Sequence, residues 1–240
     1  MSSRSRIIGP KVTGWSPPPR PDWVPMEGRY ARLEPLAEHH AGELFAANRA
    51  DDAIWDYLPY GPFAAGADYT AWVQGMAGQA DPMFLAIKDK QADQWRGVAS
   101  YLRIAPRAGS IEVGHINLAP ALQRSRAATD AMYQMMRWAF GAGYRRYEWK
   151  CDALNAGSRR AAQRLGLSFE GIFRQAAVVK GRNRDTAWFA AIDREWPALS
   201  AAFETWLAPE NFDAGGRQRQ SLSELTAPVL AARDPLFGAA

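Results

Sequence analysis

A turn rich in hydroxyl and guanidinium groups, Leu118–Thr129, precedes a stretch with helical spacing. It carries Arg124 and Arg126, and Ser125 and Thr129 add hydroxyl groups. A helix N-terminus offers unpaired backbone N–H groups and a partial positive charge. Together these groups suit a pyrophosphate. The alternative is a surface helix start with two solvated arginines, but arginine opposes the helix dipole there unless an anion compensates it.

A second helix start has the same character. Asn155 is a typical N-cap residue, and Arg159 and Arg160 follow in the first turn. Cations are disfavoured at this end of a helix, so a second phosphate nearby would explain both arginines. Side chains that simply extend into water are the alternative. Asn155 and Ser158 also have the spacing of a reciprocal cap, and capping alone would explain them.

The segment Ile111–Leu118 changes its apolar phase halfway along. Ile111 and Val113 alternate inward in one phase, whereas Ile116 lies in the other. A one-residue slip at Gly114-His115 is typical of a β-bulge, so we predict a bulge or a splay at this point. Backbone groups freed by a splay must find other partners.

The elements that position these groups follow from apolar spacing. Strand patterns span Arg29–Leu36, Met83–Lys88, Gln94–Ile104, Ile111–Leu118, Arg146–Asp152, Phe169–Lys180 and Thr186–Ile192. Helical patterns span His39–Asn48, Asp68–Met76, Ser125–Gly141, Asn155–Leu165 and Trp196–Leu207, with a short helix near Leu222–Leu230. Residues Gly181–Asp185 would join the last two strands as a hairpin loop.

The order of these elements predicts the fold class. The strand–helix–strand unit from Ile111 to Asp152 should be a right-handed parallel crossover, and the strands before it should be antiparallel. We therefore expect an α/β fold of the α+β type, in which a mixed, mostly antiparallel sheet has helices on both faces and a splayed central parallel pair. A proline-rich arm (residues 1–25) should precede the domain (26–207), and a C-terminal extension (208–240) should follow it.

Composition excludes a fully disordered chain, a collagen-like chain and a disulfide scaffold. Apolar residues make up 48% and charged residues 22% of the 240 residues, which is ordinary for a globular chain. Cys151 is the lone cysteine, so it forms no internal disulfide. One cysteine and three histidines provide few ligands for a metal site. We expect the adjacent His39 and His40 to point in different directions, and we predict no metal.

Charge and hydropathy restrict the partners. The net charge of +4 is too small and too scattered for a general nucleic-acid binder, although it leaves room for one local anion site. No stretch reaches the ~20 apolar residues of a membrane span. The N-terminus lacks the apolar run of a signal peptide. We expect a cytoplasmic protein, which fits the free thiol, with neither nucleic acid nor membrane as partner.

The motifs and their order resemble the GNAT acetyltransferase superfamily over roughly residues 26–200. The nearest branch is that of ribosomal-protein N-terminal acetyltransferases and their small-molecule relatives. The family's turn, Gln/Arg-x-x-Gly-x-Gly/Ala, is matched at Gln123 and Ala128, whereas Arg126 replaces the middle glycine. Ala128-Thr129-Asp130-Ala131 resembles the Ala-Thr-Glu-Ala of this branch, and Asn155-Ala156-Gly157-Ser158 resembles the family's Asn-x-x-Ser.

The resemblance implies acetyl-CoA as donor and a primary amine as acceptor. It places the pantetheine arm in the splay, against the backbone of Ile116, Asn117 and Leu118. An amide-bearing arm can pair with freed backbone much as a peptide adds to a sheet edge. The phosphates would lie against the basic turn and the second helix start, at Gln123, Arg124, Ser125, Arg126, Ala127, Ala128, Thr129, Asn155 and Arg159.

The resemblance also suggests catalytic roles. A protonated amine must lose a proton before it attacks. Glu112 matches the Glu of the branch's Glu-Ile-Gly-Tyr segment and would be the base or the carboxylate that orients the amine. His115 is a rival base, or a wall residue of the substrate site. Ser158 matches the serine that donates to the leaving thiolate, and a backbone N–H near Leu118 would polarise the thioester oxygen.

An aromatic loop stands where relatives keep an acceptor-gating loop. Its members Trp55, Tyr57 and Tyr60 could line the acceptor site, or they could pack the first helices together. The acceptor could be a protein N-terminus or a small or peptide-like amine. Because the loop is aromatic rather than acidic, we favour the second. A homodimer is compatible with the sequence.

Two other functions stay open at this stage. One is an acyl-CoA-binding regulatory module without turnover, which Arg126 in place of glycine would favour. The other is an RNA-associated protein that uses its basic, proline-rich arm.

Overall fold

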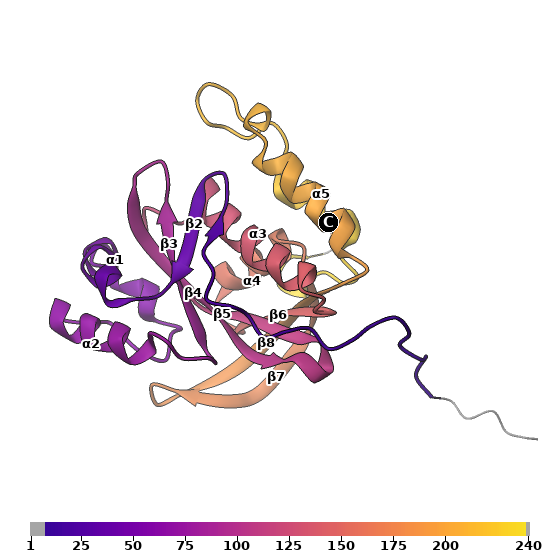
Figure 1. Ribbon diagram of the computed structural model, residues 1–240, viewed down its shortest axis with the longest axis horizontal. Helices are drawn as coiled ribbons and strands as arrows, with labels where there is room; N and C mark the ends of the chain where they lie inside the picture. Colours follow the sequence, from indigo (N-terminus) through magenta and orange to yellow (C-terminus); the bar gives the residue numbers. More distant parts are fainter. Residues whose placement is uncertain (1–7, 239–240) are drawn as a thin grey trace, which may run out of the picture.

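A computed structural model describes residues 8–238 as one eight-stranded sheet with helices on both faces (Figure 1). The strand order is β1-β2-β3-β4-β5-β6-β8-β7. The strands are β1 (Met26–Glu27), β2 (Ala31–Pro35), β3 (Met83–Asp89), β4 (Gln94–Ala105), β5 (Ser110–Leu118), β6 (Arg146–Asp152), β7 (Ser168–Val179) and β8 (Arg182–Ile192). Only β5 and β6 are parallel, so the predicted fold class is confirmed.

Two layers of helices follow from the alternation of side chains along the central strands. In β3, Leu85 and Ile87 enter one apolar core and Phe84 enters the other. The first core packs against α3 (Arg126–Gly141), α4 (Ala156–Arg164), α5 (Trp196–Leu207) and α6 (Leu222–Thr226). The second packs against α1 (Ala41–Asn48) and α2 (Gly66–Met76). None of the helices within residues 8–238 has the length and apolar character to cross a bilayer.

The central pair of strands separates halfway along. Ser110–Val113 pairs with Arg146–Trp149, and beyond this point β5 and β6 no longer pair with each other. On the other side of β5, Val98 pairs with Asn117 but Ser100 pairs with Gly114, which leaves one extra residue on β5. The predicted bulge is therefore confirmed, and His115 occupies it with a left-handed φ of 50°.

The hairpin of β7 and β8 differs from its prediction. Gly181–Asp185 was expected as a loop, but the turn consists of Lys180 and Gly181 alone, with φ values of 49° and 74°. Two central residues with positive φ match the twist of the flanking strands, so the hairpin closes tightly. Residues 182–185 therefore belong to β8, which brings Arg184 onto the sheet.

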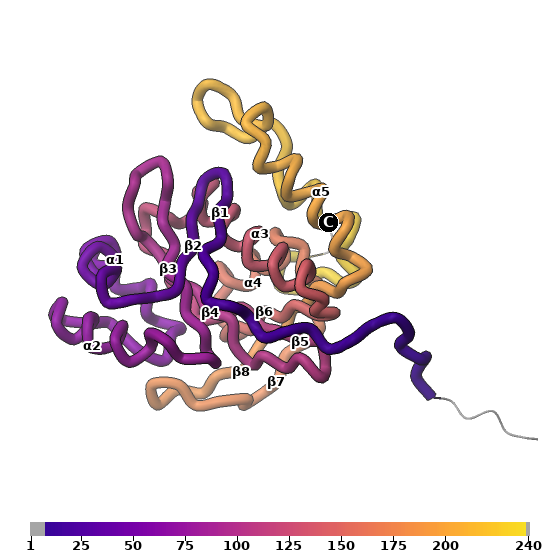
Figure 2. Tube along the Cα trace, in the orientation of Figure 1, coloured from indigo at the N-terminus to yellow at the C-terminus, as the bar shows by residue number. Residues whose placement is uncertain are grey.

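Both flanking segments contact the domain (Figure 2). In the arm, the indole of Trp15 donates a hydrogen bond to the carbonyl of Gly143 at 2.9 Å, and Pro19 accepts one from Tyr144 at 2.9 Å. In the extension, Leu222 joins the core beneath α5. The boundaries at residues 25 and 207 stay a prediction.

A buried ion pair fastens the end of the extension. Asp234 is fully buried and accepts a hydrogen bond of 2.7 Å from Nε of Arg159, whose side chain is 6% exposed. Arg159 also donates to the carbonyl of Ala153. Arg159 was expected to face a phosphate, but it faces the interior, because Asp234 supplies its counter-charge.

We predict that Asp234→Asn lowers the free energy of unfolding by about 3–5 kcal/mol, because it leaves the Arg159 charge buried without a partner. Urea denaturation measures the change. Asp193→Asn is the matched control, since Asp193 is 51% exposed and pairs with Arg145 at the surface. The control should cost less than about 1 kcal/mol. Equal effects of the two substitutions would show that the buried pair does not hold the extension.

Candidate active site

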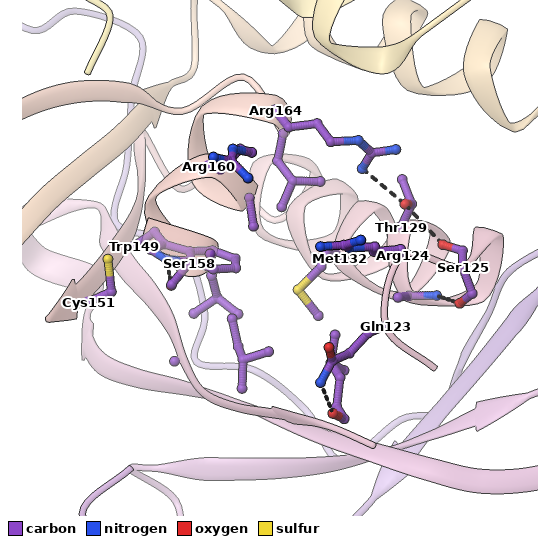
Figure 3. A pocket seen from close by; sticks show the side chains of 18 of the residues that line it. Gln123, Arg124, Ser125, Thr129, Met132, Trp149, Cys151, Ser158, Arg160 and Arg164 are labelled. Atoms are coloured by element: carbon purple, nitrogen blue, oxygen red, sulfur yellow. Dashed lines mark hydrogen bonds between the residues drawn. The ribbon is translucent and has the colours of Figure 1, made fainter. Parts of the chain in front are cut away.

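One cavity of about 1320 Å³ begins in the splay between β5 and β6 and continues to the N-terminus of α3. Residues from α4 and from the C-terminal extension complete its wall. In Figure 3, Arg160 and Arg164 face the cavity from α4, and Arg124, Ser125 and Thr129 face it from the start of α3. The two basic helix starts predicted from the sequence therefore meet across one space.

The start of α3 is held by its own side chains. Ser125 is the N-cap, and its Oγ accepts a hydrogen bond of 3.0 Å from the N–H of Ala128. Gln123 donates through Nε2 to the carbonyl of Leu118 at 3.0 Å. Arg124 has a left-handed backbone, with φ of 58°, and an exposed side chain. The turn thus presents a capped helix start together with an exposed guanidinium group.

Arg126, which replaces the family's middle glycine, directs its side chain away from the loop that precedes α3. The guanidinium of Arg126 lies 5.0 Å from the ring centroid of Tyr30 and 4.7 Å from that of Phe212. Stacking on two rings is a favourable position for a guanidinium. Its bulk therefore lies against the C-terminal extension.

At α4 the cavity is lined by different arginines from those expected. Arg160 and Arg164 line it, whereas Arg159 does not. Among residues 8–238, Arg164 has no carboxylate partner. Its Nη1 donates to Thr129 Oγ1 at 3.2 Å, and its guanidinium lies 4.8 Å from a Trp206 ring. Burial lowers the pKa of Arg164, which marks a cation that an anionic ligand would stabilise.

The cap of α4 uses the backbone N–H of Ser158 and leaves its hydroxyl available for other contacts. Asn155 Oδ1 accepts from the N–H of Ser158 at 2.9 Å, as the capping alternative expected. The Oγ of Ser158 accepts from the indole N–H of Trp149 at 2.9 Å. Because Trp149 is a donor only, the hydroxyl proton of Ser158 can go to another acceptor, and the thiol of Cys151 is one that interacts with this hydroxyl. Cys151 also lines the cavity, and burial raises the pKa of its thiol to about 11, so it is a poor nucleophile.

In the splay, Ile116 and Leu118 line the cavity, whereas Asn117 does not. The Asn117 side chain is buried, and both of its polar atoms lack a hydrogen-bond partner in the described protein. Of these three expected residues, Asn117 is therefore the one that the structure leaves out of the cavity wall.

Glu112 lies just before the bulge and is a buried carboxylate of the cavity wall. Arg103 Nη1 lies 2.6 Å from its Oε1, and Lys150 Nζ lies 2.7 Å from its Oε2. Burial raises the pKa of Glu112, and the two cations oppose this shift. Desolvation therefore increases the basicity of this carboxylate, while Arg103 and Lys150 stabilise its charged form.

His115 lies in the bulge and also lines the cavity. Burial, assisted by the charges of Arg103 and Arg184, lowers its pKa to about 4. Its ring stacks on Tyr60 at a centroid distance of 5.7 Å. The imidazole is therefore neutral at physiological pH and a weaker base than a free imidazole.

The aromatic loop divides between the two expected roles. Tyr57 lines the cavity, and its hydroxyl donates to the carbonyl of Leu154 at 3.4 Å. Trp55 is 3% exposed and packs in the core of α1 and α2, and neither it nor Tyr60 lines the cavity. The packing alternative thus describes Trp55, and Tyr60 reaches the site only through its contact with His115.

Several residues of the cavity wall escaped the sequence analysis. Lys150 and Arg184 are on strands, and Arg164 is on the last turn of α4. The alternation of β6 carried a signal for Lys150, which shares a face with Glu148. No local signal distinguishes Arg184, because the hairpin pattern assigned it to a loop.

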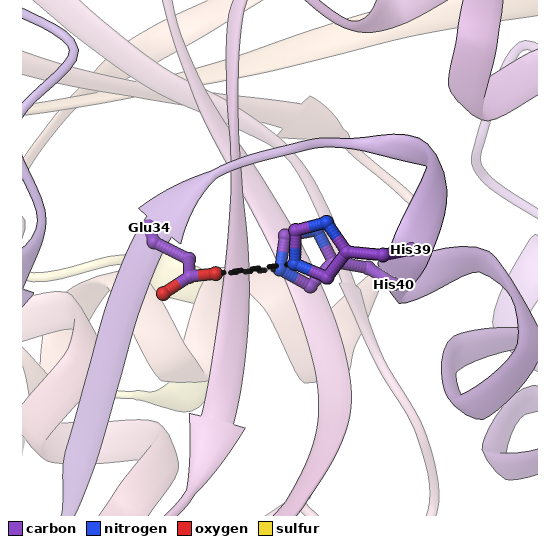
Figure 4. Close-up of side chains that lie close together, drawn as sticks. All are labelled: Glu34, His39 and His40. Atoms are coloured by element: carbon purple, nitrogen blue, oxygen red, sulfur yellow. Dashed lines mark hydrogen bonds and ion pairs between the residues drawn. The ribbon is translucent and has the colours of Figure 1, made fainter.

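The two adjacent histidines point together, contrary to expectation (Figure 4). Their ring centroids are 3.8 Å apart, and their Nε2 atoms lie 3.4 Å (His39) and 3.0 Å (His40) from Oε1 of Glu34. The reason is that His40 ends a 3-10 turn, where its Nδ1 bonds to the backbone of Ala37 and directs Nε2 toward β2. The three ligand-type atoms lie within 4.8 Å of one another.

Solved structures share the fold of this chain. A GCN5-related N-acetyltransferase from Brucella melitensis is 46% identical, with a TM-score of 0.88 over 90% of this chain and all of the other. A protein named as a probable GNAT-family acetyltransferase from Chromobacterium violaceum is 39% identical, with a TM-score of 0.75 over 82% of this chain and all of the other.

A more distant structure, the microcin C7 self-immunity acetyltransferase MccE in complex with acetyl-CoA and AMP, is 20% identical. Its TM-score is 0.61 over 68% of this chain and 93% of the other, which supports the fold alone. No curated protein matches the chain. The model of the acetyltransferase (GNAT) domain matches residues 31–168. The chain therefore belongs to the GNAT acetyltransferase family.

Proposed function

We propose that this protein transfers an acetyl group from acetyl-CoA to a primary amine by direct attack. One observation carries the proposal. A single cavity joins an arginine-lined helix start, a strand edge without a partner and a buried carboxylate. These are the three groups that the reaction needs, for phosphates, for an amide-bearing arm and for an amine proton.

The residues present fit the donor. Arg124, Arg160 and Arg164 surround the N-terminus of α3 and form no ion pair within the described part of the chain. Such cations suit the phosphates of CoA. The end of β5 that no longer pairs with β6 leaves backbone groups on that edge for the amides of the pantetheine arm.

At the other end, Glu112 takes the proton of the acceptor ammonium, directly or through water. The amine nitrogen then forms a bond to the thioester carbon, and the carbon–sulfur bond breaks. A backbone N–H near Leu118 polarises the carbonyl oxygen, and the hydroxyl of Ser158 donates a hydrogen bond to the leaving thiolate. Tyr57 also lines the cavity, and we place it against the acceptor.

The acceptor we favour is a small or peptide-like amine. A protein N-terminus, the acceptor of the ribosomal-protein branch, remains the other candidate. The resemblance to that branch rests on short motifs alone. The regulatory module without turnover loses its main support, since Arg126 stacks on Tyr30 and Phe212 instead of filling the turn. A panel of amines with a thiol-detecting readout tests the proposal. CoA-dependent thermal stabilisation without thiol release from any amine would contradict it.

We predict that Glu112→Gln lowers kcat by about 10²–10⁴-fold, because it removes the base, while the affinity for CoA changes little. Steady-state kinetics and titration with CoA measure the two effects. Glu148→Gln is the matched control, since Glu148 also contacts Lys150, at 2.8 Å, but does not line the cavity. Comparable losses in both variants would assign the effect to the ion-pair network rather than to a base.

We predict that Arg164→Gln weakens CoA binding by about tenfold or more at low salt, because it removes a charge-assisted contact to phosphate. The difference from the parent should shrink as salt rises. Isothermal titration at two ionic strengths measures it. Arg107→Gln, at an exposed arginine outside the cavity, is the control. An unchanged affinity of the Arg164 variant would remove this residue from the phosphate site.

We predict that His115 stays neutral down to about pH 5, because its pKa is about 4. This lowered pKa makes the stability of the folded protein depend on pH. The unfolded chain binds a proton at His115 near pH 6.5, whereas the folded chain does not, so stability falls as the pH drops from 6.5 toward 4. Imidazole chemical shifts measured by NMR across this range test the value. Titration of the His115 ring near pH 6.5 would restore it as a candidate base.

A further inference from the structure

The acceptor end of the cavity holds more positive than negative charge. Its wall includes the cations of Arg103, Lys150 and Arg184. Glu112 is the buried carboxylate between them, and Asp152 lies at the end of β6. An acceptor with a second amine would be repelled here, so the pattern of charges bears on the kind of amine that can enter.

Two of these cations are neutralised by the protein. Arg103 and Lys150 hold the two oxygens of Glu112, and Lys150 also lies 2.8 Å from Glu148 Oε2. The Lys150 ammonium covers the Trp188 ring, 3.8 Å from its centroid. These contacts fix both cations, so neither requires a ligand.

Arg184 is different. Its guanidinium forms no ion pair and no hydrogen bond with any residue from 8 to 238, and its Nε is buried without a partner. The two nearby carboxylates are engaged elsewhere. Asp152 accepts from the backbone of Leu154 at 2.8 Å, and Asp185 accepts from Gln175 and Asn183. A half-buried guanidinium with an orphaned N–H is costly unless a ligand satisfies it.

The position of Arg184 connects it to the reaction. Its charge acts on His115 in the bulge of β5 and on Cys151 on β6, so it lies within electrostatic range of both sides of the splay. The tight Lys180-Gly181 turn makes residue 184 part of a strand, which fixes its side chain toward the cavity. A guanidinium held in this way offers the planar, two-pronged donor set that matches a carboxylate.

We propose that Arg184 binds a carboxylate of the acceptor, so that the substrates are amines that carry a carboxylate near the amino group. This inference rests on the proposed function and names the substrate class of the same site. Two sources share this chemistry. One is the main-chain carboxylate of a free amino acid, and the other is the side-chain carboxylate of an acidic residue at a peptide N-terminus.

The test compares matched acceptors that differ only in this group. Amino acids are paired with their amides, and peptide amides that begin with Asp are paired with those that begin with Asn. We expect kcat/KM to favour the carboxylate in one of the two pairs by about 10–100-fold, the value of a charge-assisted contact. The pair that shows the preference identifies the source of the carboxylate.

Variants then assign the preference to its residue. Arg184→Gln should bring the ratio close to one, and Arg184→Lys should retain part of the preference. Arg182→Gln is the matched control, because Arg182 is exposed on the same hairpin and does not line the cavity. A wild-type ratio near one, or a ratio that Arg184→Gln leaves intact, would overturn the proposal.

A binding measurement separates this inference from the proposed function. Calorimetric titration of the CoA-loaded protein with the same pairs requires no turnover. Preferential binding of a carboxylate that Arg184→Gln abolishes, without thiol release, would support the site and contradict acetyl transfer. Equal affinities within both pairs, or no binding of any carboxylate-bearing amine, would overturn the site.

Discussion

The separation of β5 from β6 is the constraint on which the rest of this structure depends. The two strands pair through Val113 and Trp149 and then continue without each other, because the extra residue at His115 twists β5 away. A parallel pair buried in a sheet would otherwise satisfy its own backbone. The protein therefore leaves the facing edges of β5 and β6 unpaired at the centre of the sheet. The side chains around this gap keep the two strands separated.

Several residues around the gap have an unfavourable backbone conformation. Arg103, His115 and Arg124 all have a positive φ, which is unfavourable for residues with a side chain, and all three line the cavity. Such strain persists only where the surrounding structure enforces it. Here the ion pair of Arg103 with Glu112 and the stacking of His115 on Tyr60 supply this enforcement. Packing and electrostatics thus keep the site in place before any substrate arrives.

Local patterns in the sequence were enough to predict the sheet, the bulge and the helix starts, because these follow from spacing and capping. Ser125 and Asn155 cap the helices that they were expected to begin. Long-range pairing was beyond such patterns. Arg159 and Arg160 are neighbours with the same local chemistry, and only the fold places Asp234 beside the first and the cavity beside the second.

The same limit applies to the aromatic loop and to the hairpin. Ten Trp residues in one chain supply both core and surface, and spacing alone does not distinguish Trp55, which is in a core, from Tyr57, which lines the cavity. At the hairpin, the polar residues after Gly181 suggested a loop. The chain instead turns at Lys180 and Gly181, so the side chain at position 184 occupies a strand position.

The C-terminal extension changes what counts as the smallest complete unit of this protein. Phe212 and Gln218 pair in a short bridge, and both line the cavity beside Trp206. Phe212 also receives the guanidinium of Arg126. The residues matched by the family model end at position 168, yet the wall around the helix start is completed far beyond that point. A fragment trimmed to the family core would retain the gap between the strands and lose one side of the vestibule that leads to it.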